Sequence, residues 1–428
     1  MKYNTQNSKI ASITEKTLIV GIDVGSQTHY ARAFDWRNYE YSRKPFAFSN
    51  DEEGFMAFKN WMSGIAEKHG KEVVLPGMEP TGHYWFGLGM FLQNLGMRPV
   101  HVNPHHVKKS KELDDNNPNK NDKKDPKTIA ALVNEGRFSY PYIPSGIYAE
   151  IRNLSNLRFQ TQEQITRIKN RIARWFSIYF PEYKDVYGKL DALSGMMILK
   201  EAPLPGDIVK LGVDGVNKVW RNAKLRAVGL KRARTLVNKA EHSIGSQAAP
   251  EAARMELEIL IHDYEMYNQR MEELMQTIEE KLYEIPYIDK LMEIKGIGMI
   301  TICGFIAEVG DIRRFDNPKQ LQKLAGYAIV SNNSGKHNGE SRISYRGRKR
   351  LRYVLYEAAI SLIGKNAEFK EIHHYYRTRE RNPLKKMQSV IAVACKVIRI
   401  FYAILTKGVA YDGGKMLEDI KRPVVAMN

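Results

Sequence analysis

The sequence predicts an α/β N-terminal domain, long coiled-coil helices in the middle, and a mainly α-helical C-terminal domain. The apolar run at 18–25 is typical of a strand buried on both faces, and strand-like and helix-like segments alternate after it. From residue 151 onward, apolar residues recur at helical spacings over long stretches. A further apolar helical pattern begins near residue 294. We therefore place the domains at 15–140, 148–285 and 286–410.

The order of the N-terminal segments narrows the fold class. After the first strand, the patterns predict strands at 28–36 and 41–48, a helix at 51–69, a strand at 72–78, a helix at 83–95, a strand at 98–102 and a helix at 124–133. This βββαβαβα order matches ribonuclease-H-like (RuvC-like) folds, in which the first strand is central and carries a metal-binding aspartate. We expect that arrangement here.

Asp23 is the only charged residue in the apolar run at 18–25. An ionised carboxylate in a buried strand is costly unless a cation or hydrogen bonds compensate it, so Asp23 is a candidate metal ligand. Glu79 follows the strand predicted at 72–78, and Asp122 and Asp125 are spaced three apart, on one face if they are helical. Four carboxylates around one point repel one another unless hard cations neutralise them. The sequence therefore predicts a Mg²⁺ site that acts on phosphodiesters.

The composition indicates a polyanionic partner and a reducing compartment. The formal net charge is +18, and basic surface that neutralises phosphates releases counterions. Only two cysteines occur, each in an apolar helical pattern, which gives no disulfide framework. The N-terminus has no signal-peptide core, and the apolar run at 390–405 is interrupted by Lys396 and Arg399. We expect a cytoplasmic protein with no membrane span.

The middle of the chain carries a coiled-coil pattern. Ile165, Ile168, Ile172 and Trp175 are spaced three, four and three apart. The segment 257–278 alternates the same spacings over three heptads. These helices either pair within one chain as an antiparallel hairpin or pair between chains to form a dimer, and periodicity does not choose. Residues 185–250 resemble an inserted helical tip.

Two segments outside the carboxylates are candidate nucleic-acid contacts. The segment 103–124 is poor in apolar residues, so we expect a mobile loop, in which Lys108 and Lys109 are basic enough to touch a phosphate backbone. Lys295 belongs to a Lys-Gly-Ile-Gly turn that opens an apolar helix, a geometry that offers backbone N–H groups to phosphate. The alternatives are a solvated charge run and a tight turn between packed helices.

The strongest basic patch in the sequence follows a serine-containing loop. Six of the eleven residues at 342–352 are basic, with Tyr345 among them. The patch includes Arg342, Arg346, Arg348, Lys349 and Arg350. Ser334 stands beside a glycine in the preceding polar loop, near guanidinium groups that can stabilise a phosphorane-like transition state, so it is a candidate nucleophile. Ser331 is the alternative nucleophile.

These motifs in combination resemble the insertion-sequence transposases that have an N-terminal RuvC-like DEDD domain and a C-terminal serine-bearing domain. The resemblance rests on Gly-Ile-Asp-Val-Gly at 21–25, Glu-Pro-Thr-Gly-His-Tyr-Trp at 79–85, Asp-Lys-Lys-Asp at 122–125, Lys-Gly-Ile-Gly at 295–298, Ala-Glu-Val-Gly-Asp-Ile at 307–312 with Phe315, Ser-Gly at 334–335, and Leu-Arg at 351–352. It covers nearly the whole chain. One departure is Pro126, where the family has a small residue, which affects the expected helix start more than the ligand.

The resemblance implies a recombinase guided by a bridge RNA that pairs with donor and target DNA, so that base pairing supplies sequence specificity. It implies Mg²⁺ held by the four carboxylates, a serine nucleophile, and dimers that assemble into tetramers. It also implies that the carboxylate site of one subunit completes the serine site of another. The expected location is cytoplasmic and nucleoid-associated, in a bacterium or archaeon.

Three other functions fit part of the sequence. A metal-dependent nuclease or junction resolvase uses the same carboxylates with water as nucleophile. An actin-like ATP-binding protein shares the Gly-Ile-Asp-Val-Gly-Ser pattern but needs a second phosphate loop, for which the sequence has no convincing candidate. A non-catalytic RNA- or DNA-binding scaffold explains the charge and the coiled coil but not the four acidic positions.

Overall fold

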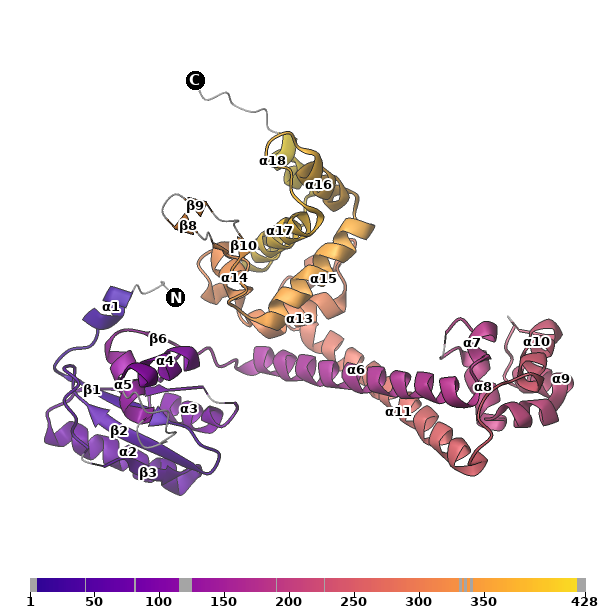
Figure 1. Ribbon diagram of the computed structural model, residues 1–428. Helices are drawn as coiled ribbons and strands as arrows, with labels where there is room; N and C mark the ends of the chain where they lie inside the picture. The colour runs from indigo at the N-terminus through magenta and orange to yellow at the C-terminus, as the bar shows by residue number, and fades with distance from the viewer. Residues whose placement is uncertain are drawn as a thin grey trace. The chain divides into compact units, whose positions relative to one another are not determined.

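The computed structural model describes residues 6–42, 44–80, 82–114, 125–189, 191–226, 228–330, 333–334, 337–338 and 342–421. At residues 112–114, 333–334, 337–338, 419 and 421 the backbone alone is described. The chain divides into two compact units, Met1–Ile143 and Pro144–Asn428 (Figure 1). Our three-part division of the chain stays a prediction.

The N-terminal unit is built on a six-stranded sheet in the order β3-β2-β1-β4-β5-β6. Its strands are β1 (Thr17–Asp23), β2 (Thr28–Phe34), β3 (Phe46–Ser49), β4 (Val73–Met78), β5 (Val100–Val102) and β6 (Phe138–Ser139). Strands β1, β4 and β5 are mutually parallel, whereas β2, β3 and β6 pair antiparallel to their neighbours. The central position of β1 is as predicted, and the strand order fits the expected ribonuclease-H-like fold. Strand β6 was not foreseen.

Helices cover both faces of this sheet (Figure 1). They are α2 (Glu52–Lys68), α3 (Trp85–Asn94), α4 (Pro104–Asp114) and α5 (Asp125–Asn134). The short helix α1 (Gln6–Ala11) precedes β1 and buries none of its residues. Leu18, Val20 and Ile22 of β1 pack in a core with residues of α2 and α3. Ile19 instead belongs to a core with residues of α4 and α5. Successive residues of β1 therefore face opposite helical layers, as a strand buried on both sides requires.

The segment 103–124 is partly helical, so our prediction of a mobile loop throughout it was wrong. Helix α4 begins at Pro104, a residue suited to the first helical turn, and the side chain of Asn103 accepts a hydrogen bond from the backbone N–H of His105 at 2.9 Å. Val107 is buried against the sheet. The burial of Val107 and a good N-terminus help to hold a helix that its polar composition did not predict.

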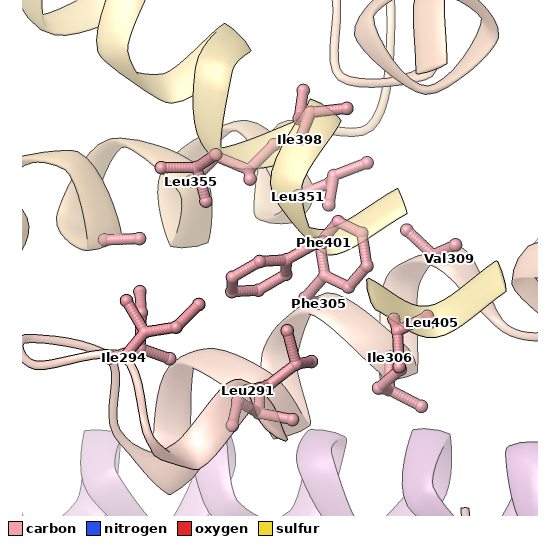
Figure 2. Close-up of a cluster of buried hydrophobic side chains, with 14 of the residues drawn as sticks. Leu291, Ile294, Phe305, Ile306, Val309, Leu351, Leu355, Ile398, Phe401 and Leu405 are labelled. Atoms are coloured by element: carbon pink, nitrogen blue, oxygen red, sulfur yellow. The ribbon is translucent and has the colours of Figure 1, made fainter. Parts of the chain in front are cut away.

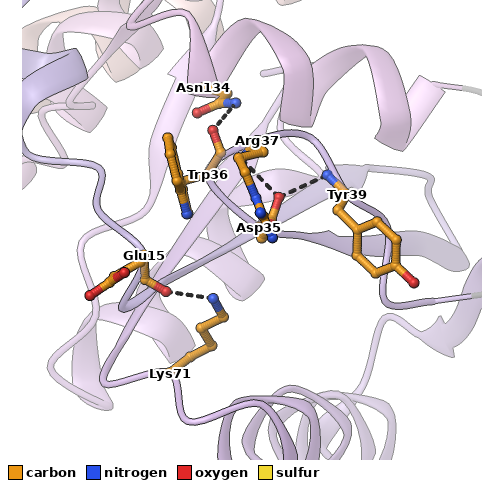
Figure 3. A network of polar contacts seen from close by, with 7 residues as sticks. All are labelled: Glu15, Asp35, Trp36, Arg37, Tyr39, Lys71 and Asn134. Atoms are coloured by element: carbon orange, nitrogen blue, oxygen red, sulfur yellow. Dashed lines mark hydrogen bonds and ion pairs between the residues drawn. The ribbon is translucent and has the colours of Figure 1, made fainter.

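Polar contacts around the turn after β2 fix the C-terminal end of α5 (Figure 3). The carboxylate of Asp35, which is 1% exposed, accepts hydrogen bonds from the backbone N–H groups of Arg37 and Tyr39, each at 2.8 Å. Asn134, the last residue of α5, donates from Nδ2 to the carbonyl oxygen of Trp36 at 2.7 Å. The helix is thereby tied to the sheet at one end, which restricts where its N-terminus lies.

The second unit contains the two long helices, α6 (Gly146–Tyr179) and α11 (Pro250–Tyr283), which pack against each other within one chain. Ile151, near the start of α6, shares a core with Leu274 and Ile278, near the end of α11. At the other end, Ile172 shares a core with Leu257. The helices therefore run antiparallel within one chain. Of the two arrangements that the periodicity left open, this one is the hairpin. Pairing between chains stays a prediction.

The helical tip between these two helices has a core of its own. It contains α7 (Tyr183–Val186), α8 (Leu193–Glu201), α9 (Pro205–Asn222) and α10 (Leu230–Glu241). Trp220 and Leu236 are fully buried there with residues of α6 and α11. The bidentate ion pair of Arg254 with Asp207 joins α11 to α9 at 2.8 and 2.9 Å.

The C-terminal part of the second unit is a helical bundle with short strands. Its helices are α12 (Ile288–Met292), α13 (Met299–Val309), the 3₁₀ turn η1 (Ile312–Arg314), α14 (Pro318–Leu324), α15 (Lys349–Lys365), α16 (Ala367–Thr378), α17 (Lys386–Lys407) and α18 (Gly413–Lys421). Its strands are β7 (Ile329–Val330), β8 (Asn333–Ser334), β9 (His337–Asn338) and β10 (Arg342–Ile343). Phe305 of α13 and Phe401 of α17 pack edge to face in the core between these helices, with their ring centroids 5.0 Å apart (Figure 2).

Helix α17 is long and apolar enough to cross a membrane by length and composition alone. In the structure it is the central helix of this core, because Val393, Val397 and Ile398 are all buried among other helices. The ammonium of Lys396 donates to the carbonyl oxygen of Met416 at 3.3 Å. The structure therefore uses α17 as a core helix.

Candidate active site

The ends of two parallel strands place Asp23 beside Glu79. The register of β1 and β4 pairs Ile22 with Met78, and each residue of β1 lies opposite the residue 56 positions later in β4. Asp23 is the last residue of β1 and Glu79 directly follows β4, so continuing the same register by one residue would set the two next to each other. Neighbouring strands are about 5 Å apart, so both carboxylates start from adjacent positions at one edge of the sheet.

Both carboxylates belong to the face of the sheet that α5 covers. A Cβ on Gly21 would lie 1.9 Å from the carbonyl oxygen of Pro126, and a Cβ on Gly77 would lie 2.4 Å from a side-chain carbon of Val133. Because side chains two apart in a strand share a face, Asp23 and Glu79 lie on the face that Gly21 and Gly77 present to α5. The two glycines allow α5 to approach the strands closely, which brings its N-terminus to the acidic edge.

Asp125 is the first residue of α5, and Lys111 of α4 forms an ion pair with its carboxylate. Burial raises the pKa of Glu79 above its usual value, the positive charge of Lys111 lowers it, and the negative charge of Asp125 raises it. The side chains of Lys111 and Asp125 are therefore close enough to Glu79 to change the pKa of its carboxyl group. The N-terminus of α5 adds a positive helix-dipole end, which favours anionic side chains at this point.

The carboxylate oxygens at this edge of the sheet suit a hard divalent cation. Carboxylate oxygens are the ligands that Mg²⁺ prefers, and the Lys111 ammonium shows that this edge already attracts a cation. Among the described residues, no group of three or more His, Cys, Asp or Glu side chains lies close enough to hold a metal ion. Asp122, the fourth predicted ligand, lies outside the described residues. The fourfold convergence therefore stays a prediction.

Lys111 is the site residue that our sequence reasoning missed. We selected Lys108 and Lys109 from the same basic run, and both are exposed on α4. Lys111 is four residues after the buried Val107, so the two share the helix face that meets the sheet. That spacing was a usable signal, but only once the segment was recognised as helical.

The predicted nucleophile lies in a short hairpin of the second unit. Backbone hydrogen bonding pairs Ser334 of β8 with His337 of β9, and the side chain of Ser334 is outside the described residues. The hairpin lies between β7 and β10, which pair antiparallel with Val330 opposite Arg342. The alternative nucleophile, Ser331, also lies outside the described residues. The structure thus gives the backbone setting of Ser334 and not its side-chain chemistry.

The basic patch after this hairpin divides into structural and exposed side chains. Arg348 donates to the backbone carbonyl of Glu308 at 2.8 Å and pairs with its carboxylate at 3.3 Å. Arg352 donates to the carbonyl oxygens of Ala325 and Tyr345, at 3.0 and 3.2 Å. These two arginines hold the base of the loop. The exposed basic side chains are those of Arg342, Arg346, Lys349 and Arg350.

The Lys-Gly-Ile-Gly turn is built into the packing of the bundle. Gly296 has a φ of 102°, and a Cβ there would lie 3.3 Å from the Cα of Leu362 in α15. The hydroxyl of Ser361 donates to the carbonyl oxygen of Gly296 at 2.7 Å. This favours the interpretation as a tight turn between packed helices, while Lys295 itself is exposed. Its contact with phosphate stays a prediction.

Comparisons with known proteins match both halves of the chain. Residues 20–181 match the DEDD domain of IS110-type transposases, described as "Transposase", and residues 288–376 match the domain described as "Transposase IS116/IS110/IS902 family". The chain is 22% identical to the insertion element IS116 uncharacterized 44.8 kDa protein of Streptomyces clavuligerus. The aligned region of 287 residues covers 67% of this chain and 71% of that protein.

Two further relatives match parts of the chain. The insertion element IS900 uncharacterized 42 kDa protein of Mycobacterium paratuberculosis is 24% identical over 298 residues, 68% of this chain and 73% of that protein. The pilin gene-inverting protein of Moraxella bovis is 29% identical over 124 residues, 28% of this chain and 38% of that protein.

An acidic edge on an α/β sheet, a basic serine-bearing loop and these matches together define a transposase, a class of enzyme that processes DNA. The chain belongs to the IS110/IS116 family of insertion-sequence transposases, and models of both family domains match it. The resemblance that we identified from the motifs is confirmed at this level.

Proposed function

We propose that this transposase cuts and rejoins DNA by transesterification through Ser334, with Mg²⁺ held by Asp23, Glu79, Asp122 and Asp125 of a ribonuclease-H-like domain. The main support is the acidic edge of the sheet, where β1 ends at Asp23, Glu79 follows β4, α5 approaches the strands closely, and Lys111 pairs with Asp125. The bound metal supplies neutralisation of charge on the attacking and leaving oxygens.

The proposed chemistry conserves the energy of the phosphodiester bond. The Oγ–phosphorus bond of Ser334 forms as the bond from phosphorus to one deoxyribose oxygen breaks, and the serine proton ends on the released deoxyribose hydroxyl. A hydroxyl of another strand end then reverses the exchange and regenerates the serine. Exposed Arg342 and Arg346 flank the serine hairpin and hold the DNA backbone by phosphate contacts.

Specificity and assembly are further parts of this proposal. A guide RNA pairs with donor and target DNA, and the protein holds the resulting duplexes by shape and charge, which suits its net charge of +18. The active chain is a homodimer or a dimer of dimers in the cytoplasm, where the carboxylate site of one subunit serves the serine of another. The support for assembly in trans is that the two sites lie in separate compact units.

A covalent intermediate tests the serine route. The wild-type protein, incubated with guide RNA, donor DNA and target DNA in MgCl₂, is expected to give a protein–DNA adduct that survives denaturation. Ser334→Ala abolishes the adduct, whereas the matched control Ser331→Ala retains it. Asp23→Asn or chelation of Mg²⁺ abolishes both cleavage and adduct. Omitting the RNA tests the guided specificity separately.

The outcomes separate the alternatives. An adduct lost in Ser331→Ala and retained in Ser334→Ala would transfer the role to Ser331. Cleavage that proceeds in wild type with no adduct at any time would replace the serine route by a metal-dependent nuclease or junction resolvase with water as nucleophile. That alternative draws on the same carboxylates.

A further inference from the structure

A pocket of about 640 Å³ opens between α6, α13 and α15 in the second unit. Its size falls in the range of roughly 300–1,000 Å³ that accommodates small ligands. Phe159 of α6 and Tyr353 of α15 supply aromatic walls, and Ile300 at the start of α13 supplies an apolar wall. Tyr353 is 55% exposed and Ile300 is 51% exposed. Neither the carboxylate site nor the serine loop includes these side chains.

The aromatic wall of the pocket carries positive charge. The guanidinium groups of Arg158 and Arg350 lie 5.5 and 4.9 Å from the centroid of the Phe159 ring. The Nε of Arg158 is buried and has no hydrogen-bond partner among the described residues. Because that atom has almost no accessible surface, an acceptor in the pocket would meet the terminal guanidinium N–H groups of Arg158, which is one of the residues that line the pocket.

The rim of the pocket carries hydrogen-bonding groups of both kinds. Thr301 and Ser361 contribute hydroxyls, Glu163 and Glu357 contribute carboxylates, and Arg167 contributes a further guanidinium. The two carboxylates repel a phosphate group inside the pocket. A phosphate backbone is favoured instead at the exposed Lys349, at the start of α15. The guanidinium of the neighbouring Arg350 already lies over the Phe159 ring and donates to Oδ1 of Asn156. The chemistry therefore fits a flat, uncharged ring that has both donors and acceptors on its edge, attached to an anionic chain outside.

We propose that this pocket binds an unstacked nucleobase of a single-stranded segment while the adjacent basic residues of α15 hold its phosphates. The base stacks on Tyr353 or Phe159, as bases stack on aromatic side chains in other single-strand sites. Its acceptor edge meets Arg158 and its amino group meets Glu163 or Glu357. This proposal rests on the chain's action on nucleic acid but not on the serine chemistry.

The test compares an oligonucleotide that has all its bases with the same oligonucleotide carrying one abasic site, bound to the full-length protein in fluorescence anisotropy titrations. The wild type is expected to bind the intact strand about tenfold more tightly than the best-placed abasic strand. Tyr353→Ala and Phe159→Ala remove most of that preference. Tyr353→Phe retains it, because the stacking ring stays. Tyr283→Ala, a control at an exposed tyrosine at the end of α11, also retains it.

Two readouts separate loss of the pocket from loss of the fold or of backbone binding. The salt dependence of binding is expected to be unchanged in Tyr353→Ala, because phosphate contacts on α15 remain. Melting temperatures check that each variant is folded. An equal affinity of wild type for intact and abasic strands, at every abasic position, would overturn the proposal. Parallel DNA and RNA strands show which of the two supplies the base, and neither result depends on whether Ser334 is the nucleophile.

Discussion

Lys111 of α4 and Asp125 of α5 form an ion pair across the acidic edge of the N-terminal sheet. The pair connects two helices whose N-terminal segments both lie on the face that Asp23 and Glu79 share. A cation from the chain itself therefore stands among the carboxylates for which we propose a metal. Displacement of that ammonium is expected to be part of metal binding.

Lys111→Ala is expected to lower the melting temperature of the metal-free protein and to tighten its binding of Mg²⁺ or Mn²⁺ by about threefold or more, because a competing positive charge is gone. Melting temperatures across a MnCl₂ series, with calorimetry, measure both effects. Lys108→Ala, on the same helix but exposed, is the control and is expected to change neither quantity. An unchanged metal affinity in Lys111→Ala would show that the ammonium does not compete for the site.

Gly21→Ala is expected to destabilise the protein by about 1–3 kcal/mol, because its Cβ would collide with backbone and α5 would have to move. That Cβ would lie 1.9 Å from the Pro126 carbonyl oxygen. Gly64→Ala in the exposed middle of α2 has open space around its Cβ and is expected to stabilise by about 0.5–1 kcal/mol. Urea unfolding followed by circular dichroism measures both changes. If the two variants shift stability alike, α5 does not depend on the glycine for its approach.

His101 of β5 gives the N-terminal unit a dependence on pH. Burial lowers its pKa to about 4, and its Nε2 has no hydrogen-bond partner among the described residues. Between about pH 4 and 6.5 the unfolded chain binds more protons than the folded one, so the free energy of unfolding falls as pH falls through this window. The contribution of the neutral His101 to the free energy of unfolding is fully present above about pH 6.5, which is the pKa of a histidine in the unfolded chain.

The expected result is that His101→Gln flattens the plot of melting temperature against pH between 4 and 6.5. Some dependence should remain, because burial also lowers the pKa of His29, which is fully buried. Replacing the exposed His105 by Gln serves as the control and should leave the wild-type profile. A His101→Gln profile parallel to wild type would assign the effect to other groups.

Substitutions in the basic patch are expected to have two different effects. Two of them weaken nucleic-acid binding, and one lowers the stability of the fold. Arg346→Ala and Lys349→Ala are each expected to weaken nucleic-acid binding and to reduce the slope of log affinity against log salt by about one. Arg348→Ala is instead expected to cost about 1 kcal/mol of stability, because its bonds to Glu308 are structural. Salt titrations by anisotropy and thermal melts measure these effects. A full loss of salt dependence in Arg348→Ala alone would reverse the assignment.

Local patterns in the sequence were sufficient for most helices and strands. The first strand and the helix expected at 51–69 form as predicted, because each depends on neighbours in the chain. Asp51 caps α2 by accepting a hydrogen bond from the Gly54 N–H at 2.8 Å. Helix α4 was missed because its stability comes from Val107 packing on a sheet formed by distant segments.

The candidate site shows the same division between local and long-range information. An isolated carboxylate in a buried strand was enough to single out Asp23, and the motif spacings were enough to identify the family. The sequence by itself determined the family and supplied the candidate residues for the chemistry, because residue type, motif and periodicity are local properties of the chain. Only the tertiary structure decided that Glu79 lies beside Asp23, that Lys111 pairs with Asp125, and that α6 and α11 form a hairpin. The reason is that strand register, helix approach and helix pairing are set by contacts between residues far apart in sequence, which no local pattern encodes.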